Sequence, residues 1–180
     1  MTEEIIIAGF GGQGVLYMGK IMAYSAVMQD MEVSWMPSYG PEMRGGTANV
    51  IVIISSERIS SPIIKRFDTA IILNQQSLDK FENTIKPGGV LIYDINGITR
   101  HPERTDITIY RVDAVTEAAK LESPKTFNMV VLGGFLKIKP VIKLENVLKG
   151  LKKSLPERYH NLIPMNEQAL ARGMKVILKV

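Results

Sequence analysis

Residues 5–14 read Ile-Ile-Ile-Ala-Gly-Phe-Gly-Gly-Gln-Gly, an apolar run that passes directly into a glycine-rich stretch. Apolar residues then recur at helical spacing from Val15 to Ala26, which predicts a helix over residues 13–29. A strand, a glycine-rich turn and a helix in this order can bring backbone amides close to an anion. The stretch therefore predicts an α/β protein with its functional edge at these glycines.

The rest of the chain alternates between strand-like and helix-like patterns. Strands are predicted over residues 4–8, 32–36, 48–54, 69–73, 90–94 and 107–112. Helices are predicted over residues 75–85, 114–121, 128–138, 144–151 and 157–172. This alternation predicts one domain over residues 1–180 with a three-layer α/β/α, Rossmann-like fold and a largely parallel sheet.

Several boundaries carry more specific expectations. Pro37 is expected to end the second strand, and Gly173 to close the last helix. The β-branched run Val50–Ile54 predicts a central strand that is covered on both faces. Residues 128–138 are apolar on nearly all sides, which predicts a helix buried in the core or against another subunit.

Composition excludes several classes of site and places the protein in the cytoplasm. The chain has no cysteine and two histidines, so it can form no disulfide or cysteine-ligated iron–sulfur cluster, and a metal site is not expected. No apolar run is long enough for a membrane span. The net charge is +4, and many of the lysines lie in the C-terminal part of the sequence. We interpret them either as a solvated helical face or as a docking surface for an acidic partner. No nucleic-acid-binding motif accompanies them, so a nucleic-acid site is not expected.

The glycines match a dinucleotide-binding fingerprint in their letters. Gly9, Gly11 and Gly14 fit the G-x-G-x-x-G spacing. That fingerprint also needs an acidic residue at the end of the second strand to hold the ribose, and Met36 and Pro37 stand there. The set of residues needed to bind NAD or FAD is therefore incomplete. A free-standing NAD(P)- or FAD-dependent oxidoreductase remains an alternative function.

The loop over residues 37–47 is the most unusual segment of the chain. It is either a structural loop in which Glu42 pairs with Arg44, or a ligand- or subunit-contacting loop in which Arg44 meets a phosphate or carboxylate. Asn74 is either a helix cap or a ligand contact. The carboxyl ends of parallel strands share one edge, so the candidate contact residues should meet there. They are Gly11, Gly12, Gln13, Gly14, Tyr39, Gly40, Glu42, Arg44, Gly45, Gly46 and Asn74, with no catalytic residue among them.

Two motifs in this order resemble one known family. Gly9–Gly14 followed by Pro37–Thr47 (Pro-Ser-Tyr-Gly-Pro-Glu-Met-Arg-Gly-Gly-Thr) resembles the gamma subunit of 2-oxoacid:ferredoxin oxidoreductases, nearest to the 2-oxoglutarate type. Further agreement comes from Asn74-Gln75, Lys86–Gly89 and Asn128–Gly133, so that the resemblance spans almost the whole chain. Pyruvate, branched-chain and indolepyruvate enzymes belong to the same group of relatives.

The resemblance implies a place in a multi-subunit enzyme of the cytoplasm. Such complexes oxidatively decarboxylate a 2-oxoacid with thiamine diphosphate and magnesium, form an acyl-coenzyme A and reduce ferredoxin through iron–sulfur clusters. The resemblance places these cofactors in alpha, beta and delta partner subunits, so that this chain alone binds none and has no activity. It implies a role in assembly for Gly11–Gly14 and Tyr39–Gly46, with contact to coenzyme A as a second role. A small-ligand or phosphate-binding module remains a further alternative.

Overall fold

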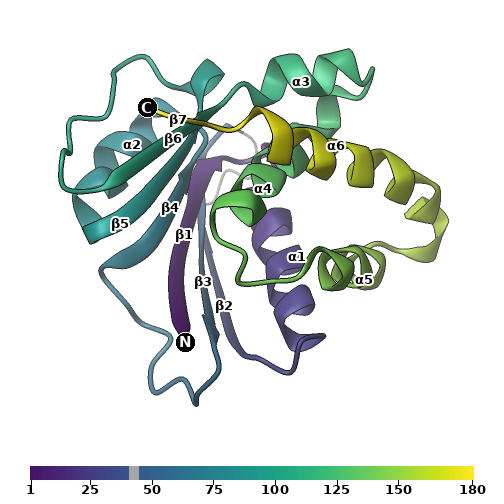
Figure 1. Cartoon of the computed structure of the whole chain (residues 1–180), viewed down its shortest axis with the longest axis horizontal. Coiled ribbons are helices and arrows are strands. Elements are labelled where there is room, and N and C mark those ends of the chain that lie inside the picture. Colours follow the sequence, from purple (N-terminus) through teal and green to yellow (C-terminus); the bar gives the residue numbers. More distant parts are fainter. Residues whose placement is uncertain (41–44) are drawn as a thin grey trace.

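The computed structural model describes residues 1–40 and 45–180 and is built around one mixed sheet (Figure 1). The strand order is β2-β3-β1-β4-β5-β6-β7. The strands span β1 (Thr2–Phe10), β2 (Glu32–Tyr39), β3 (Thr47–Ser55), β4 (Phe67–Ile72), β5 (Ile85–Asp94), β6 (Thr108–Val112) and β7 (Leu178–Lys179). β1, β4, β5 and β6 run parallel, whereas β3 is antiparallel to β1 and β2, and β7 is antiparallel to β6. The predicted α/β class with a largely parallel sheet is confirmed.

Helices flank this sheet unequally (Figure 1). The α-helices span α1 (Val15–Val27), α2 (Gln75–Phe81), α3 (Ala114–Lys120), α4 (Phe127–Ile138), α5 (Leu144–Ser154) and α6 (Ile163–Val176). Short 3-10 helices span η1 (Glu82–Thr84), η2 (Ile95–Gly97), η3 (Pro124–Thr126) and η4 (Glu157–Leu162). α1 and α4 pack on one face, with α5 outside α1 and α6 outside α4, while α2 packs on the other face.

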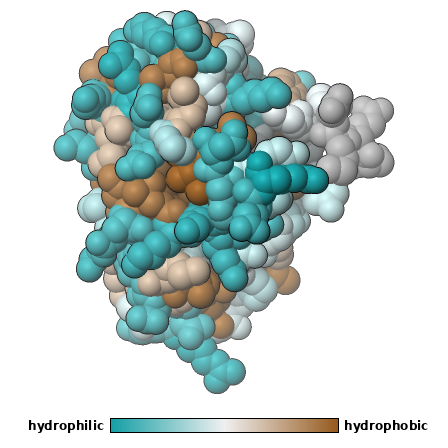
Figure 2. Space-filling model, turned by 90° about the vertical axis from the view of Figure 1, so that its right-hand side faces the viewer, coloured by the Kyte–Doolittle hydropathy of each residue, from teal (hydrophilic) through white to brown (hydrophobic). Residues whose placement is uncertain are grey.

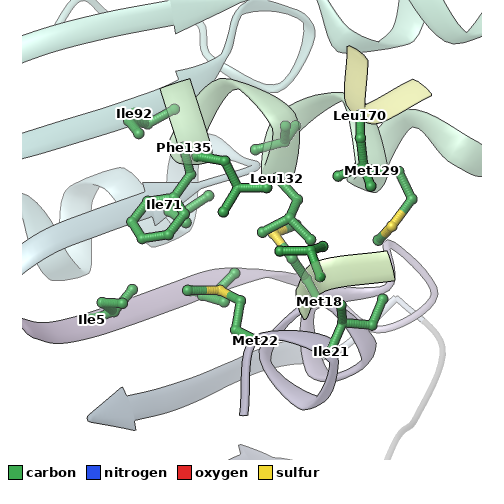
Figure 3. Close-up of a cluster of buried hydrophobic side chains, with 14 of the residues drawn as sticks. Ile5, Met18, Ile21, Met22, Ile71, Ile92, Met129, Leu132, Phe135 and Leu170 are labelled. Carbon is green, nitrogen blue, oxygen red and sulfur yellow. The ribbon is translucent and has the colours of Figure 1, made fainter. Parts of the chain in front are cut away.

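The larger core lies between the sheet and α1 and α4 (Figure 3). The close-up shows α1 and α4 side chains facing strand residues, among them Ile5, Met18, Met22, Ile71, Ile92, Met129, Leu132 and Phe135. α4 is buried from Asn128 to Leu136, because α6 covers the side of α4 that the sheet does not. This confirms the predicted buried helix and places it in the core of this chain.

α4 and α6 cross so closely that their glycines are part of the packing. A side-chain carbon at Gly133 would overlap the backbone oxygen of Leu170, and one at Gly173 would overlap that of Val130. The expectation that Gly173 closes the last helix is wrong, since α6 continues to Val176. Gly173 is needed for the crossing and not for a helix end.

Two strand predictions also need correction. Pro37 does not end the second strand, because β2 continues to Tyr39 as an edge strand, where a missing N–H can be tolerated. The run Val50–Ile54 lies in β3, which is second from the edge and antiparallel rather than central. α1 covers one face of this strand, whereas Ile51 on the other face stays partly exposed.

The outer layer of the helical side carries both polar and apolar surface. Figure 2 shows the face formed by α5, η4 and α6, where hydrophobic residues gather between hydrophilic ones. α5 buries Val147 and Leu151 and exposes Lys149, Lys152 and Lys153. Within residues 1–40 and 45–180, no helix combines the length and the apolar character that a bilayer crossing requires.

Candidate functional site

The glycine turn, residues Gly9–Gly14, links β1 to α1 at the carboxyl end of β1. The backbone N–H of Gln13 donates to the oxygen of Phe10 at 3.1 Å, which closes a β-turn. Gly12 has a φ of +98° and Gly14 a φ of +74°. A φ near +80° at the third turn position is what a type II turn requires, and it favours glycine.

The side chain of Gln13 braces this turn. Its Oε1 accepts a hydrogen bond from the N–H of Phe10 at 2.6 Å, and its Nε2 donates to the oxygen of Leu73 at 3.4 Å. A side-chain carbon at Gly9 would lie 2.5 Å from that Oε1. The first glycine of the apparent dinucleotide fingerprint therefore makes room for a glutamine side chain.

Backbone hydrogen bonds join the glycine turn to the connection between β2 and β3. The N–H of Gly11 donates to the oxygen of Gly46 at 2.8 Å, and the N–H of Gly45 donates to the oxygen of Gly11 at 3.3 Å. The glycine turn, these loop residues and the segment at Leu73 therefore meet at one sheet edge, as predicted. Glu42 and Arg44 lie outside the described residues.

Two cavities adjoin the glycine turn, and a third lies next to them. The first, of about 290 Å³, lies between the turn, the first turn of α1 and Tyr39 at the end of β2. The second, of about 420 Å³, is lined by the turn together with Lys125 and Asn128. The third, of about 200 Å³, is lined by Tyr17, Lys125 and Asn128 together with residues of α6. Because they share lining residues, they form one trough that an extended ligand or a peptide segment could follow.

The backbone amides along this trough have the polarity of an anion site. Among the described residues, the N–H groups of Gly12, Gly14, Val15 and Leu16 have no hydrogen-bond acceptor. These groups are at the positive end of α1, whose first turn contains no acidic residue. The arrangement can bind a phosphate or carboxylate.

Side chains on the far side of the turn add to this polarity. Asn128 is only 6% exposed, lies against Gly14, and its side chain has no hydrogen-bond partner within the described part of the chain. Lys125 contributes a cation to the second cavity. Although Asn128 is a residue type that often caps helices, it does not cap α4, because Thr126 is at the cap position and Asn128 is inside the first turn.

Tyr17 lines both the first and the third cavity. Burial raises the pKa of its phenol, against the opposing effect of the Ser154 hydroxyl, which donates to the Tyr17 oxygen at 3.3 Å. The phenol therefore stays neutral over the physiological range and offers the trough an aromatic surface with a polar tip. No local motif marks Tyr17 or Lys125, and their participation follows only from how η3 and α1 pack together.

The remaining predicted residues take clear places. The side chain of Asn74 accepts from the N–H of Ser77 at 2.8 Å and caps α2, which is the first of the two interpretations. Its Nδ2 is buried without a hydrogen-bond partner in the described structure, and the residue does not line the three cavities. Tyr39 is 56% exposed beside the first cavity, and Gly40 follows it at the end of β2.

The sheet topology argues against the dinucleotide interpretation. In a dinucleotide-binding unit, the second strand pairs directly with β1, parallel to it, and presents the ribose-binding acid next to the glycines. Here β4 is the parallel neighbour on one side of β1, and on the other side the antiparallel β3 separates β1 from β2. The carboxyl end of β3 at Ser55 pairs with Thr2, at the sheet edge opposite to the glycines. In the described ranges, no three His, Asp or Glu side chains are grouped as a metal site would require.

Comparison with known proteins identifies the family. The family described as "Pyruvate ferredoxin/flavodoxin oxidoreductase" matches residues 4–176. The chain is 34% identical to "2-oxoglutarate synthase subunit KorC" of Methanocaldococcus jannaschii over 87% of this chain and 86% of that protein. It is 42% identical to "Ketoisovalerate oxidoreductase subunit VorA" of Methanothermobacter thermautotrophicus over 72% of this chain, but spans only 27% of that longer protein.

Solved structures share the fold over nearly the whole chain. The gamma subunit of keto/oxoacid ferredoxin oxidoreductase from Geobacter sulfurreducens gives a TM-score of 0.84 at 28% identity, covering 98% of this chain and 96% of that chain. The 2-oxoglutarate:ferredoxin oxidoreductase of Magnetococcus marinus, solved with 2-oxoglutarate, coenzyme A and succinyl-CoA bound, gives 0.85 at 24% identity. The match covers 96% of this chain and 30% of that one, and it supports the fold alone.

Proposed function

The chain belongs to the pyruvate ferredoxin/flavodoxin oxidoreductase family as a gamma subunit of the 2-oxoacid:ferredoxin oxidoreductases, and on this premise we propose that it serves a complex that forms an acyl-coenzyme A from a 2-oxoacid. The first candidate substrate is 2-oxoglutarate, because a 34% identical relative that is matched over 86% of its own length is a 2-oxoglutarate synthase subunit. In this proposal ferredoxin takes the electrons, and the complex works in the cytoplasm.

The residues of this chain do not fit the redox cofactors of such a complex. Thiolate-ligated clusters need cysteine, and the sequence has none. In this proposal the clusters therefore lie outside this subunit, and the family resemblance, not the composition, places the thiamine chemistry in partner subunits. Alpha, beta and delta partner subunits are the proposed holders of thiamine diphosphate, magnesium and the clusters.

The proposed role of this chain is to contact coenzyme A at the glycine turn and to help assemble the complex. The observation that carries the first part is the row of amides at the start of α1 that have no acceptor among residues 1–40 and 45–180, beside Lys125 and Asn128. Coenzyme A offers phosphates for these groups and an extended body for the adjoining cavities. The Magnetococcus enzyme, which was solved with coenzyme A bound, contains a region of the same fold.

Steady-state kinetics of the reconstituted complex tests the coenzyme A contact. We expect Lys125→Ala to raise the KM for coenzyme A about tenfold, because a charge-assisted contact to phosphate is lost, while the KM for the 2-oxoacid stays unchanged. Lys149→Ala on the exposed face of α5 is the matched control, since it removes the same charge far from the glycine turn. Equal KM values for coenzyme A in both variants would contradict the contact.

Co-purification tests the role in assembly. A tagged copy of this chain, expressed together with the alpha and beta subunits, should recover both partners, and only the assembled sample should form acyl-coenzyme A. An isolated chain that turns over a 2-oxoacid without partners, or that binds NAD(P) or FAD tightly, would support the free-standing oxidoreductase instead.

A further inference from the structure

We propose that Gln13 is a positioning residue, which acts on coenzyme A only by holding the amides of the glycine turn in place. This inference rests on the proposed function, because it explains how the turn keeps the shape that the ligand needs. From the sequence alone, Gln13 could contact a ligand or a subunit or could brace a neighbouring loop, and the proposal commits it to the bracing role.

The polar atoms of the Gln13 side chain are already engaged by the protein. Oε1 accepts from the N–H of Phe10 at 2.6 Å, and Nε2 donates to the oxygen of Leu73 at 3.4 Å. A carboxamide that bonds one backbone donor and one backbone acceptor is held in orientation at both of its ends, although one N–H and one lone pair are left over. Although Gln13 lines the second cavity, these bonds direct its amide toward the protein backbone.

The same bonds fix the two sides of the turn relative to the sheet. Phe10 is the last residue of β1, and Leu73 directly follows β4. Gln13 lies between Gly12 and Gly14, whose amides lack acceptors in the described residues. A brace at this position fixes the direction of both N–H groups before the ligand binds. Binding therefore loses no conformational entropy in ordering the turn.

Gln29, which lies just beyond the other end of α1, provides a comparison. It also uses its side chain as a brace, since Nε2 donates to the oxygen of Val141 at 3.1 Å and Oε1 accepts from the N–H of Lys143 at 2.8 Å. The two glutamines lie at opposite ends of α1, which is 13 residues and therefore about 20 Å long. Gln29 thus does for the end of α1 what Gln13 does for its beginning, but far from the turn.

The test compares Gln13→Met with Gln29→Met in the reconstituted complex. Methionine keeps the length of the side chain and removes both strong hydrogen bonds. We expect Gln13→Met to raise the KM for coenzyme A about tenfold through misplaced amides, with kcat within about twofold and the KM for the 2-oxoacid unchanged. Gln29→Met should lower the melting temperature to a similar extent and leave every KM unchanged.

Hydrogen exchange of the assembled complex gives the direct structural readout. The amide of Phe10 should exchange faster in Gln13→Met than in Gln29→Met, because its acceptor is gone. If Gln13→Met fails to assemble, Gln13→Glu replaces it, since the carboxylate still accepts from Phe10 but cannot donate to Leu73. A wild-type KM for coenzyme A in the variant that assembles overturns the positioning role.

A third variant separates this inference from the proposed function. Gly12→Val disturbs the turn directly and leaves the Gln13 side chain in place. If Gly12→Val raises the KM for coenzyme A and Gln13→Met does not, the positioning role is wrong and the coenzyme A contact stands. If neither variant changes it, the contact itself is wrong and the inference falls with it.

Discussion

Two glycine-rich regions of this protein use the same residue for opposite purposes. At the crossing of α4 and α6, Gly133 and Gly173 lie so close to the backbone of the partner helix that a methyl group has no room. At the glycine turn, Gly12 has no atom of the described residues within 4 Å of the place where a side-chain carbon would lie. The helix crossing uses glycine to bring backbones together, whereas Gly12 uses it to adopt a positive φ beside open space.

The difference indicates where a ligand or partner is to be sought. Glycines that are surrounded on all sides by atoms of the same chain are explained by the packing of that chain. A glycine with a left-handed backbone, an open surface and a free N–H is not explained by packing, and such a position suits contact with something outside the chain. Substitutions at these positions therefore separate the two purposes.

The largest effect is expected at the helix crossing. Gly173→Ala places a methyl group into the backbone oxygen of Val130, so that α4 and α6 must move apart. We expect the free energy of unfolding to fall by about 3 kcal/mol, measured by chemical denaturation of the isolated chain.

Gly134→Ala in the same helix is the control for that variant. Its methyl group would lie 2.9 Å from Cδ1 of Ile177, the mobile end of a side chain, and the gain in helix propensity offsets part of the strain. We expect its stability to change by less than about 1 kcal/mol. Equal losses for the two variants would mean that the crossing tolerates separation and that Gly173 is not required for it.

Gly14→Ala should lower the free energy of unfolding by less than Gly173→Ala does. Two separable effects contribute to this loss. The residue has a φ of +74°, and a methyl group there would overlap the side-chain amide of Asn128. We expect a loss of about 2 kcal/mol. In an Asn128→Ala background the steric part disappears, so a smaller loss for Gly14→Ala should remain. A double-mutant cycle without coupling would contradict the contact between the two residues.

Gly12→Val should lower stability by about 1 kcal/mol, which is the cost of a positive φ without any clash. Its effect on the complex should be larger than its effect on the fold, because the free amides turn with the backbone. Thermal unfolding of the isolated chain measures the first effect, and recovery of partner subunits measures the second. Unchanged values of both would refute the requirement for a positive φ.

The fold could be predicted because hydrophobic patterns report burial directly. The continuous apolar patterns at Ile5–Ala8 and at Asn128–Ile138 predict cover on all sides, and residues 5–8 and 128–136 are buried, whereas Lys137 is exposed. Strand direction could not be predicted in this way. Val50–Ile54 is equally apolar in a parallel or an antiparallel strand, and only the pairing with β1 decides between them.

The candidate site could be predicted only in part. Glycines and the loop after β2 stand out locally, and their meeting at one sheet edge follows from strand ends alone. Lys125 and Asn128 were missed as site residues because more than a hundred positions separate them from Gly14 in the sequence. Nothing in their local pattern signals that η3 and the start of α4 fold against the glycine turn.

The smallest change in stability is expected for Tyr17→Phe. This variant also tests whether the glycine turn or the neighbouring Tyr17 makes the main contact with the ligand. Tyr17→Phe removes a single long hydrogen bond with Ser154 and keeps the aromatic ring, so stability should change by less than about 1 kcal/mol. Since burial raises the pKa of the phenol above its ordinary value of 10.0, this group does not ionise between pH 6 and 9 and adds no pH dependence there. If the trough binds coenzyme A mainly through the glycine turn, Tyr17→Phe leaves the KM for coenzyme A within about twofold, whereas Gly12→Val does not. A large rise in the KM for coenzyme A in Tyr17→Phe would mean that the main contact is made by the Tyr17 hydroxyl and not by the glycine turn.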